Sequence, residues 1–432
     1  MLDSPAKYCS LSDNLHSNTL FGIQQLKAEG ASDNELSELL KSSLYYLVLH
    51  EMGHTMGLNH NMKASQLYSL AEINNKELTS KTGLTGSVMD YPAINIASEK
   101  SKQGQYMTTV PGPYDKWAIE YGYSEALENA ADEEKRLKKI VSRSTEHDLA
   151  FGNDADDMRS PGGGIDPRVN INDLTNDAIL YSVDRMNIAE SLLGKLKQKY
   201  NAPNQSYHEL KTSYNIIMAQ YASSASVISR YVGGIYIDRA YTAQQGATKP
   251  YTPVSYKDQK RAIDALAKYI FSPAAFAQNR DIYNYLQTQR RGFNFFSSTE
   301  DPKIHDVVLS VQRNALNHLL NPVVMKRITD SQLYGNQYKL PELLNDLTNA
   351  VFKDDIAVSV STFRQNLQSE YVSRLLEIIK TGAAKYDNIA EANAYAQIKN
   401  IEKLVQTPTT DTGTKNHRQY LAYKIEEALK EK

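Results

Sequence analysis

The sequence predicts a mainly α-helical protein with at most one small β-hairpin. Apolar residues recur at helical spacing through most of the 432 residues. Only two stretches, 234–241 and 251–256, have the aromatic and β-branched content of strands. Hydrophobic residues make up 41% of the chain, which is enough for a folded core, and the length suits two or three domains.

The charge balance and the single cysteine exclude several classes of protein. Lys and Arg number 48 and Asp and Glu number 50, so the net charge is −2 and a basic nucleic-acid binder is not expected. The apolar run 44–49 is far shorter than the roughly 20 residues of a membrane helix, so we expect no membrane span in this chain. Cys9 stands alone and forms neither an intramolecular disulfide nor a four-cysteine zinc site.

The best candidate for a domain boundary is the loop 151–176, which is rich in Gly, Pro and Asp. We therefore expect one region at 1–150 and a helical accessory domain at 177–432. In the first region, a capping box of Ser32 and Glu35 begins a helix that Gly57 ends. The other helices predicted from spacing and caps are 12–29, 66–78, one beginning at 113, 124–144, 177–200, 206–231, 257–270, 304–320, 341–351, 362–380 and 388–405.

The most informative segment lies at the end of the second predicted helix and in the turn after it. His50 and His54 are four residues apart, so a helix places both imidazoles on one face, where they can share a Zn²⁺ ion. Glu51 follows His50 directly and can take a proton from a water beside the metal. Gly57 tolerates a positive φ, so the chain can turn sharply and return His60 as a third ligand. Three protein ligands and one open position are the arrangement of a catalytic zinc site.

These residues resemble the metzincin clan of zinc metalloproteases, whose motif is HExxHxxGxxH. A second element, SVMDY at 87–91, resembles the methionine turn that these proteins carry beneath the metal, in the form of the astacin and serralysin families. The segment 112–122 is similar to the helix that follows this turn in large bacterial met-zincins. The resemblance extends over about residues 10–123.

The resemblance implies a secreted or cell-envelope zinc endopeptidase that acts on a protein or peptide substrate. The three histidines would bind one catalytic Zn²⁺, and Glu51 would be the general base. Met89 would form an apolar floor beneath the imidazoles, and Tyr91 would be a displaceable ligand or a donor to the oxyanion. The implied fold is the C-terminal part of a metzincin-like catalytic domain, followed by the helical domain.

One feature departs from the metzincin pattern. Metzincins build a twisted sheet before the active-site helix, and its edge strand pairs with the extended substrate. Only 49 residues precede His50 here, and two predicted helices occupy nearly all of them. We therefore expect further domains upstream in the full-length protein, and weak peptidase activity without them. The alternative is a substrate groove that is assembled in another way.

Two other interpretations stay open. Glu72 is a rival third ligand, because the gluzincin clan takes a Glu from a later helix. The chain could also be a zinc-containing binding or scaffold module that has the fold of a protease and cleaves nothing.

Calcium is a secondary candidate cofactor, because it prefers clustered oxygen ligands in loops. The spacing does not match the D-x-[DN]-x-[DN]-G pattern, which favours a solvated loop. The residues concerned are Asn153, Asp154, Asp156, Asp157, Asp166, Asp173 and Asp177.

Overall fold

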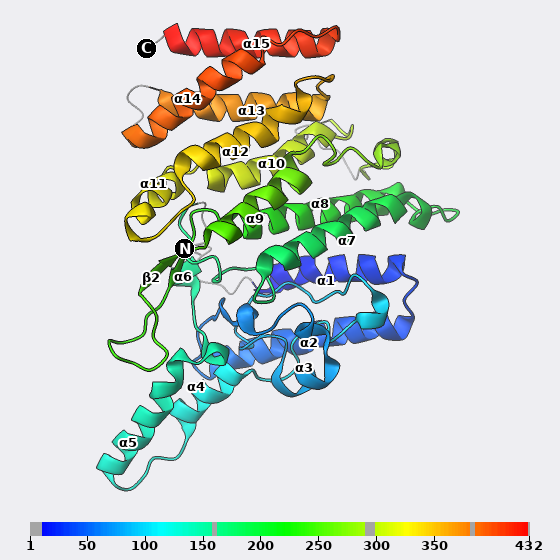
Figure 1. Ribbon diagram of the computed structural model, residues 1–432. Helices are drawn as coiled ribbons and strands as arrows, with labels where there is room; N and C mark the ends of the chain where they lie inside the picture. Colours follow the sequence, from blue (N-terminus) through cyan, green and yellow to red (C-terminus); the bar gives the residue numbers. More distant parts are fainter. Residues whose placement is uncertain (1–10, 158–161, 290–298, 381–384, 431–432) are drawn as a thin grey trace, which may run out of the picture. The chain divides into compact units, whose positions relative to one another are not determined.

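The computed structural model describes residues 11–157, 162–289, 299–380 and 385–430, so Cys9 lies outside the described residues. Within these ranges the protein consists of helices and connecting loops, together with one two-stranded sheet (Figure 1). The prediction of a mainly α-helical fold with a small hairpin is confirmed. None of the described helices is long and apolar enough to cross a membrane.

The described residues form two compact units. The first takes in residues up to 157, together with 164–188 and 236–251, and the second takes in the rest. Helix α7 (Ala178–Lys199) begins in the first unit and ends in the second. The functional domains predicted from the loop at 151–176 stay a prediction.

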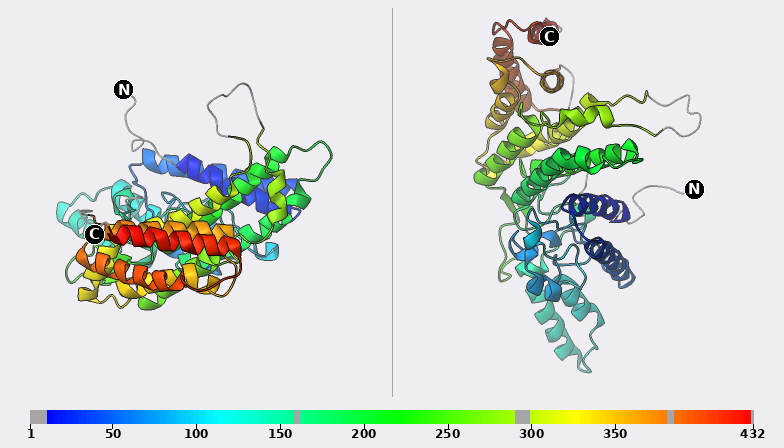
Figure 2. Two further views of the ribbon diagram at one scale, coloured as in Figure 1. Left: turned by 90° about the horizontal axis from the view of Figure 1, so that it is seen from above. Right: turned by 90° about the vertical axis from the view of Figure 1, so that its right-hand side faces the viewer.

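The first unit contains the helices around the histidine motif. Helices α1 and α2 are joined by a short turn at Gly30 and lie side by side (Figure 2). Residues from both helices, among them Phe21 and Leu39, are buried. The helices of this unit are α1 (Leu11–Ala28), α2 (Asp33–Thr55), α3 (Lys76–Thr82), α4 (Pro113–Tyr123), α5 (Ala130–Val141), α6 (Asp154–Asp157) and the beginning of α7.

The capping box at the start of α2 has both of its hydrogen bonds. The backbone N–H of Glu35 donates to Ser32 Oγ at 3.3 Å, and the Ser32 N–H donates to Glu35 Oε2 at 2.8 Å. At the other end Gly57 has φ 78°, a left-handed conformation that an L side chain rarely adopts. The sequence therefore fixes both ends of the helix that carries the first two histidines.

The prediction of one helix at 66–78 is wrong. The structure has two short 3₁₀ turns there, Ala64–Leu67 and Glu72–Asn74, and then α3. The reason is Asn75, whose side chain accepts hydrogen bonds from the backbone N–H groups of two following residues and so begins a new helix. The helix predicted at 124–144 is likewise shorter, because Asn129 caps the start of α5.

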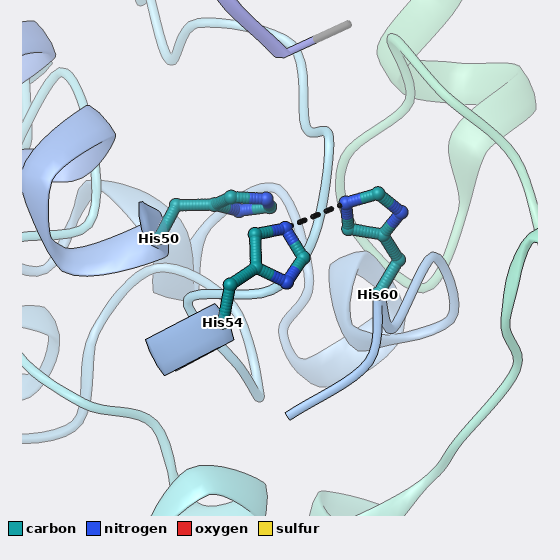
Figure 3. Close-up of side chains that lie close together, drawn as sticks. All are labelled: His50, His54 and His60. Atoms are coloured by element: carbon teal, nitrogen blue, oxygen red, sulfur yellow. Dashed lines mark hydrogen bonds between the residues drawn. The ribbon is translucent and has the colours of Figure 1, made fainter. Parts of the chain in front are cut away.

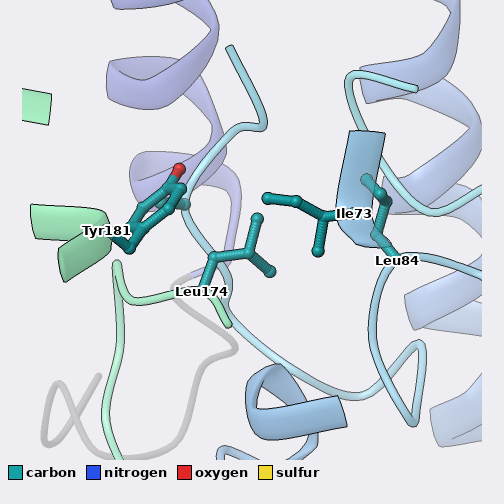
Figure 4. Close-up of a cluster of buried hydrophobic side chains, with 5 residues drawn as sticks. Ile73, Leu84, Leu174 and Tyr181 are labelled. Carbon is teal, nitrogen blue, oxygen red and sulfur yellow. The ribbon is translucent and has the colours of Figure 1, made fainter. Parts of the chain in front are cut away.

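A small apolar cluster lies behind these turns. Its side chains come from the turn region, from the loop before α4, from the loop before α7 and from α7 itself (Figure 4). Tyr181 also donates its hydroxyl hydrogen to the carbonyl oxygen of Ile94 at 2.8 Å. This cluster gives the loop-rich part of the unit its own core. Its members are Ile73, Leu84, Ala93, Leu174 and Tyr181.

The described residues of the second unit are mainly helical. Its helices pack on one another through buried Leu, Ile and Val side chains. A buried ion pair, Arg364 Nε to Asp355 Oδ2 at 2.7 Å, lies among them. Two of the helices, α11 and α15, were not predicted. The bounds are α8 (Tyr207–Ser229), α9 (Tyr256–Leu266), α10 (Ile304–Leu319), α11 (Pro322–Ser331), α12 (Leu340–Phe352), α13 (Thr362–Ile379), α14 (Asn388–Leu404), α15 (Thr412–Lys430), β1 (Ile235–Ile237) and β2 (Tyr251–Pro253).

Candidate metal centre

The three histidines of the motif come together in the first unit. His50 and His54 project from the last turns of α2, and His60 returns after the turn at Gly57 (Figure 3). One ring nitrogen from each lies within 4.8 Å of the others. The Nε2 atoms of His54 and His60 are 3.1 Å apart. Tetrahedral zinc with Zn–N bonds of about 2.0–2.1 Å needs ligand nitrogens roughly 3.3 Å apart, so the donor set fits zinc.

The rings on α2 are oriented by backbone carbonyl groups. His50 Nδ1 lies 2.8 Å from the carbonyl oxygen of Val88, and His54 Nδ1 lies 3.1 Å from that of Leu58. Because a carbonyl oxygen can only accept, each Nδ1 carries the hydrogen and each Nε2 keeps its lone pair. Both imidazoles are therefore held in the tautomer that binds a metal through Nε2.

A carboxylate orients the third ring. His60 Nδ1 lies 2.7 Å from Asp154 Oδ2, so Nδ1 donates and Nε2 again carries the lone pair. The Nε2 lone pairs of His54 and His60 therefore face each other at 3.1 Å. Two such lone pairs repel unless a cation or a proton lies between them. This juxtaposition is the strongest structural support for a metal ion at this site.

Burial keeps His50 in the neutral form that a metal needs. The ring is buried, and desolvation of the charged form lowers its pKa from the usual 6.5 to about 3. The Val88 carbonyl opposes this shift, and the neighbouring imidazoles His54 and His60 add to it. No proton needs to be displaced from His50 before it coordinates a metal at neutral pH.

The segment 87–91, which the sequence predicts to be a methionine turn, packs against α2 at a glycine. A Cβ placed on Gly53 would collide with the sulfur of Met89, so only glycine lets the turn approach the helix this closely. Met89 is fully buried. The contact with Met89 therefore requires a glycine at position 53, between the two histidines of α2.

The turn is held in place from α4 as well as from α2. Asp115 of α4 accepts hydrogen bonds from the Ser87 hydroxyl, from the Val88 N–H at 2.8 Å and from the Gly112 N–H at 2.8 Å. Tyr46 of α2 donates its hydroxyl hydrogen to the Asp90 carbonyl oxygen at 2.5 Å. Since the Val88 carbonyl orients His50, Asp115 acts on the metal centre through the turn.

Tyr91 follows the turn and faces the histidines. Its side chain is buried, and its hydroxyl oxygen lies 3.3 Å from His60 Nε2. The ring centroids of Tyr91 and His50 are 5.5 Å apart. The hydroxyl group is therefore close enough to the converging nitrogens to donate to an oxygen bound there.

The two glutamates considered from the sequence differ in their surroundings. Glu51 is exposed on α2, and its carboxylate makes no hydrogen bond or ion pair within the described part of the chain. Glu72 accepts from the N–H and the hydroxyl of Ser69, at 2.9 and 2.7 Å, which lowers its pKa. Among the residues that the structure describes, the metal-ligand cluster contains the three histidines and not Glu72.

The acidic residues of the predicted connecting loop have separate partners. Asp154 binds His60, Asp156 pairs with Arg239, and Asp166 pairs with Arg168. Asp173 accepts from Ser65 and Gln66, and Asp177 caps α7. Calcium binding here stays a prediction.

The comparison with protein families agrees with this geometry. A family model described as Met-zincin matches residues 32–358, more than half of the chain. The chain belongs to the Met-zincin family. No curated protein and no solved structure matches it. The matched range includes the three histidines, the segment 87–91 and α4, and it continues into the helices of the second unit.

Two residues that build this Met-zincin centre were missed in the sequence. Asp154 was considered only as one of several calcium candidates, and nothing in its sequence context singles it out as the partner of His60. Asp115 had a better signal, because an Asp three residues after Gly112 fits the start of a helix. Its contacts with the methionine turn depend on the tertiary fold.

Removal of the Asp154 carboxylate should weaken zinc binding. Asp154→Ala leaves His60 without the acceptor that fixes its tautomer and orientation, and such losses cost about 10–100-fold in metal affinity. Competition with a chromogenic chelator measures the affinity. Asp132→Ala, on the exposed side of α5, is the matched control and should bind zinc like the original protein. Equal affinity of the Asp154 and Asp132 variants would mean that this carboxylate does not support the site.

Gly53→Ala should destabilise the protein, because the new methyl group meets the Met89 sulfur. Overpacking of this kind costs about 1–3 kcal/mol. Gly122→Ala is the control, since a Cβ there meets nothing within 4 Å and alanine favours a helix by up to about 1 kcal/mol. Thermal or urea unfolding of the zinc-loaded variants measures the difference. A Gly53→Ala variant as stable as Gly122→Ala would contradict the packing described for the turn.

Proposed function

We propose that this Met-zincin is a zinc-dependent endopeptidase. The observation that carries the proposal is the convergence of three Nε2 lone pairs, with every Nδ1 already donating to an oxygen. Three imidazole ligands leave one coordination position for a water molecule or a substrate oxygen, as in catalytic rather than structural zinc sites. A secreted or cell-envelope location is part of this proposal and rests on the family resemblance.

The chain's own residues would then divide the reaction between them. His50, His54 and His60 would hold the zinc ion, which would supply Lewis acidity to a water molecule and to the scissile carbonyl group. Glu51 accepts the proton of the attacking water and passes it to the leaving amine. Tyr91 donates its hydroxyl hydrogen to the oxyanion of the tetrahedral intermediate. The exposed, unpaired carboxylate of Glu51 supports the role of a group that must both accept and release a proton.

One face of α2 exposes a row of apolar side chains to solvent. Leu44, Val48 and Met52 recur every four residues and are 63%, 56% and 55% exposed. Leu40 and Tyr45 extend this stripe of apolar side chains. Monomeric proteins rarely expose contiguous apolar surface of this kind, and where they do it marks an interaction site. We propose that polypeptide upstream in the full-length protein covers this α2 stripe and completes the substrate cleft.

A catalytically silent zinc module is the alternative, and an α2 stripe that stays uncovered in the full-length protein would favour it. Without a surface to hold an extended peptide, a metal centre gains little from its chemistry, because orientation contributes a large share of catalysis. Zinc content does not separate the two proposals, since both predict a bound ion.

Glu51→Gln should retain zinc and lose peptidase activity. The amide has nearly the same shape but accepts no proton at neutral pH, and general base catalysis is worth about 10²–10⁴-fold. Cleavage of a labelled unfolded protein measures the rate, and metal analysis of the same sample measures the zinc. Glu38→Gln, another exposed position on α2, is the matched control and should cleave normally.

Two results would count against the endopeptidase. Cleavage by Glu51→Gln at the original rate would remove Glu51 as the general base. Zinc-loaded protein that cleaves nothing, even in its full-length form, would favour the silent module.

A lysine in the α2 stripe should act differently in this chain and in a longer form that includes upstream sequence. In this chain Val48→Lys is a surface change and should alter stability by less than about 0.5 kcal/mol. In the longer form the same lysine would be buried without a partner, which is strongly unfavourable, so stability and activity per bound zinc should both fall. Val323→Lys, at an exposed position in α11, is the control. Equal behaviour of Val48→Lys in both forms would mean that nothing upstream covers the stripe.

A further inference from the structure

A cavity of about 680 Å³ lies in the first unit, beside the segments that carry His60 and Asp154. One part of its wall is aromatic, from Tyr114, Trp117 and Phe151, and another is charged, from Lys63, Asp166 and Arg168. None of these residues takes part in the metal centre described above. The size is in the range of cavities that enclose small ligands or substrate side chains.

The cavity and the metal centre share two stretches of chain. Lys63 follows His60 by three residues, and Asp156, which also lines the cavity, follows Asp154 by two. The stretches are joined by the hydrogen bond from the Met62 N–H to the Gly152 carbonyl oxygen, at 2.7 Å. A group bound in the cavity therefore lies next to the segments that hold the third metal ligand.

Lys63 is the unusual group in this wall. Its side chain is only 15% exposed, and its nearest acidic oxygen, Asp166 Oδ2, is 3.9 Å away. That separation is too long for a hydrogen bond, and the ammonium group donates none within the described part of the chain. Burial, together with the nearby Arg168, lowers the pKa of Lys63. The structure thus keeps a largely buried cation whose N–H groups lack an acceptor, which is costly unless a ligand supplies one.

The acidic groups around Lys63 are already used by other partners. Asp166 accepts from the Arg168 guanidinium at 2.9 and 2.7 Å and from the Ile237 N–H at 3.0 Å. Asp156 pairs with Arg239, and Asp238 accepts from Thr248 at 2.6 Å. These carboxylates favour the charged form of Lys63 through space, but no described residue accepts a hydrogen bond from its ammonium group.

The aromatic side of the cavity suits a ligand with an apolar stem. Tyr114 and Phe151 are stacked, with ring centroids 5.4 Å apart. Trp117 is held by its indole N–H, which donates to the Ile140 carbonyl oxygen at 2.8 Å. Apolar walls lower the local dielectric, so an ion pair formed within the cavity is stronger than the same pair in water.

We propose that this cavity binds a carboxylate, with Lys63 as its charged partner and the aromatic rings around its stem. The carboxylate can come from an Asp or Glu side chain or from the C-terminus of a peptide. As a binding site the cavity is independent of catalysis. Its role as a pocket that selects acidic substrates rests on the proposed peptidase function.

Fluorescence of Trp117 provides a direct test of binding, because it is the only tryptophan of the chain. The probes are N-acetyl-glutamate amide with its neutral analogue N-acetyl-glutamine amide, and N-acetyl-alanine with N-acetyl-alanine amide. The acid of at least one pair should shift the emission and bind at least about tenfold more tightly than its amide, because charge-assisted hydrogen bonds are roughly twice as strong as neutral ones. The pair that shows the difference identifies the source of the carboxylate. If neither acid binds better than its amide, the proposal is wrong.

Lys63→Met tests whether the lysine is the partner. Methionine keeps an unbranched apolar stem and removes the charge, so the preference for the acid should fall at least about tenfold. Lys81→Met, on the exposed side of α3, is the matched control and should leave it unchanged. Circular dichroism confirms that both variants are folded, and the acid–amide comparison in the original protein stands even if Lys63→Met does not fold. A folded Lys63→Met variant that still prefers the acid would overturn the assignment.

A peptide series then links the cavity to cleavage. The peptides differ by Glu or Gln at single positions, or by a free or amidated C-terminus. The original protein should cleave the acidic peptide of a pair with a kcat/KM at least about tenfold higher than the neutral one. This difference should be much smaller for Lys63→Met. The same series is measured with the zinc-loaded full-length protein. Acid binding seen by fluorescence, without cleavage of any peptide by that full-length form, would support the carboxylate site and rule out the peptidase function. If the acidic and neutral peptides are cleaved with equal kcat/KM, the peptidase function is supported and the preference for acidic substrates is ruled out.

Discussion

The candidate metal centre depends on one constraint: each imidazole of the motif donates its Nδ1 hydrogen to an oxygen that the fold supplies. The HExxH spacing alone places rings on one face of a helix, but it does not decide which nitrogen points inward. The orientation is set by three oxygens that accept from Nδ1, which belong to the Val88 carbonyl, the Leu58 carbonyl and the Asp154 carboxylate. Once they are in place, the three Nε2 atoms converge and their mutual repulsion favours a cation.

The three oxygens come from segments that are far apart in the sequence, so the rest of the first unit serves to bring them together. Leu58 is part of the turn that Gly57 permits. Val88 belongs to the segment 87–91, whose backbone donates a hydrogen bond to Asp115 of α4. This segment can pack closely on α2 because Gly53 has no side chain at the contact. The glycine in the middle of the HEMGH segment and the aspartate of α4 are therefore parts of one arrangement. Their variants should affect metal affinity and folding together.

Much of this could be predicted from the sequence, because helices and their caps are local features. Ser32 and Glu35 indicated the start of α2 correctly, and the histidine spacing indicated the cluster. The backbone carbonyls that orient the rings have no signature in a sequence. Asp154 lies 94 residues after His60, in a loop with many other acidic residues, so no pattern distinguishes it. Lys63 was unremarkable for the same reason, since only the tertiary fold shows that its ammonium group is enclosed.

Helix α2 carries the histidines on one face and the exposed apolar stripe on another. His50 and Gly53 lie on the buried face, against the methionine turn, while the α2 stripe lies on the opposite, exposed face. Glu51 is three residues after Val48 and seven after Leu44, so helical geometry places its carboxylate beside the stripe rather than behind the metal. Polypeptide that covers the stripe would also remove water from around Glu51. A carboxylate with fewer water neighbours interacts more strongly with the groups that remain around it, because the local dielectric is lower. In the proposed peptidase, the same upstream polypeptide would both position the substrate and set the surroundings of Glu51, the proposed general base.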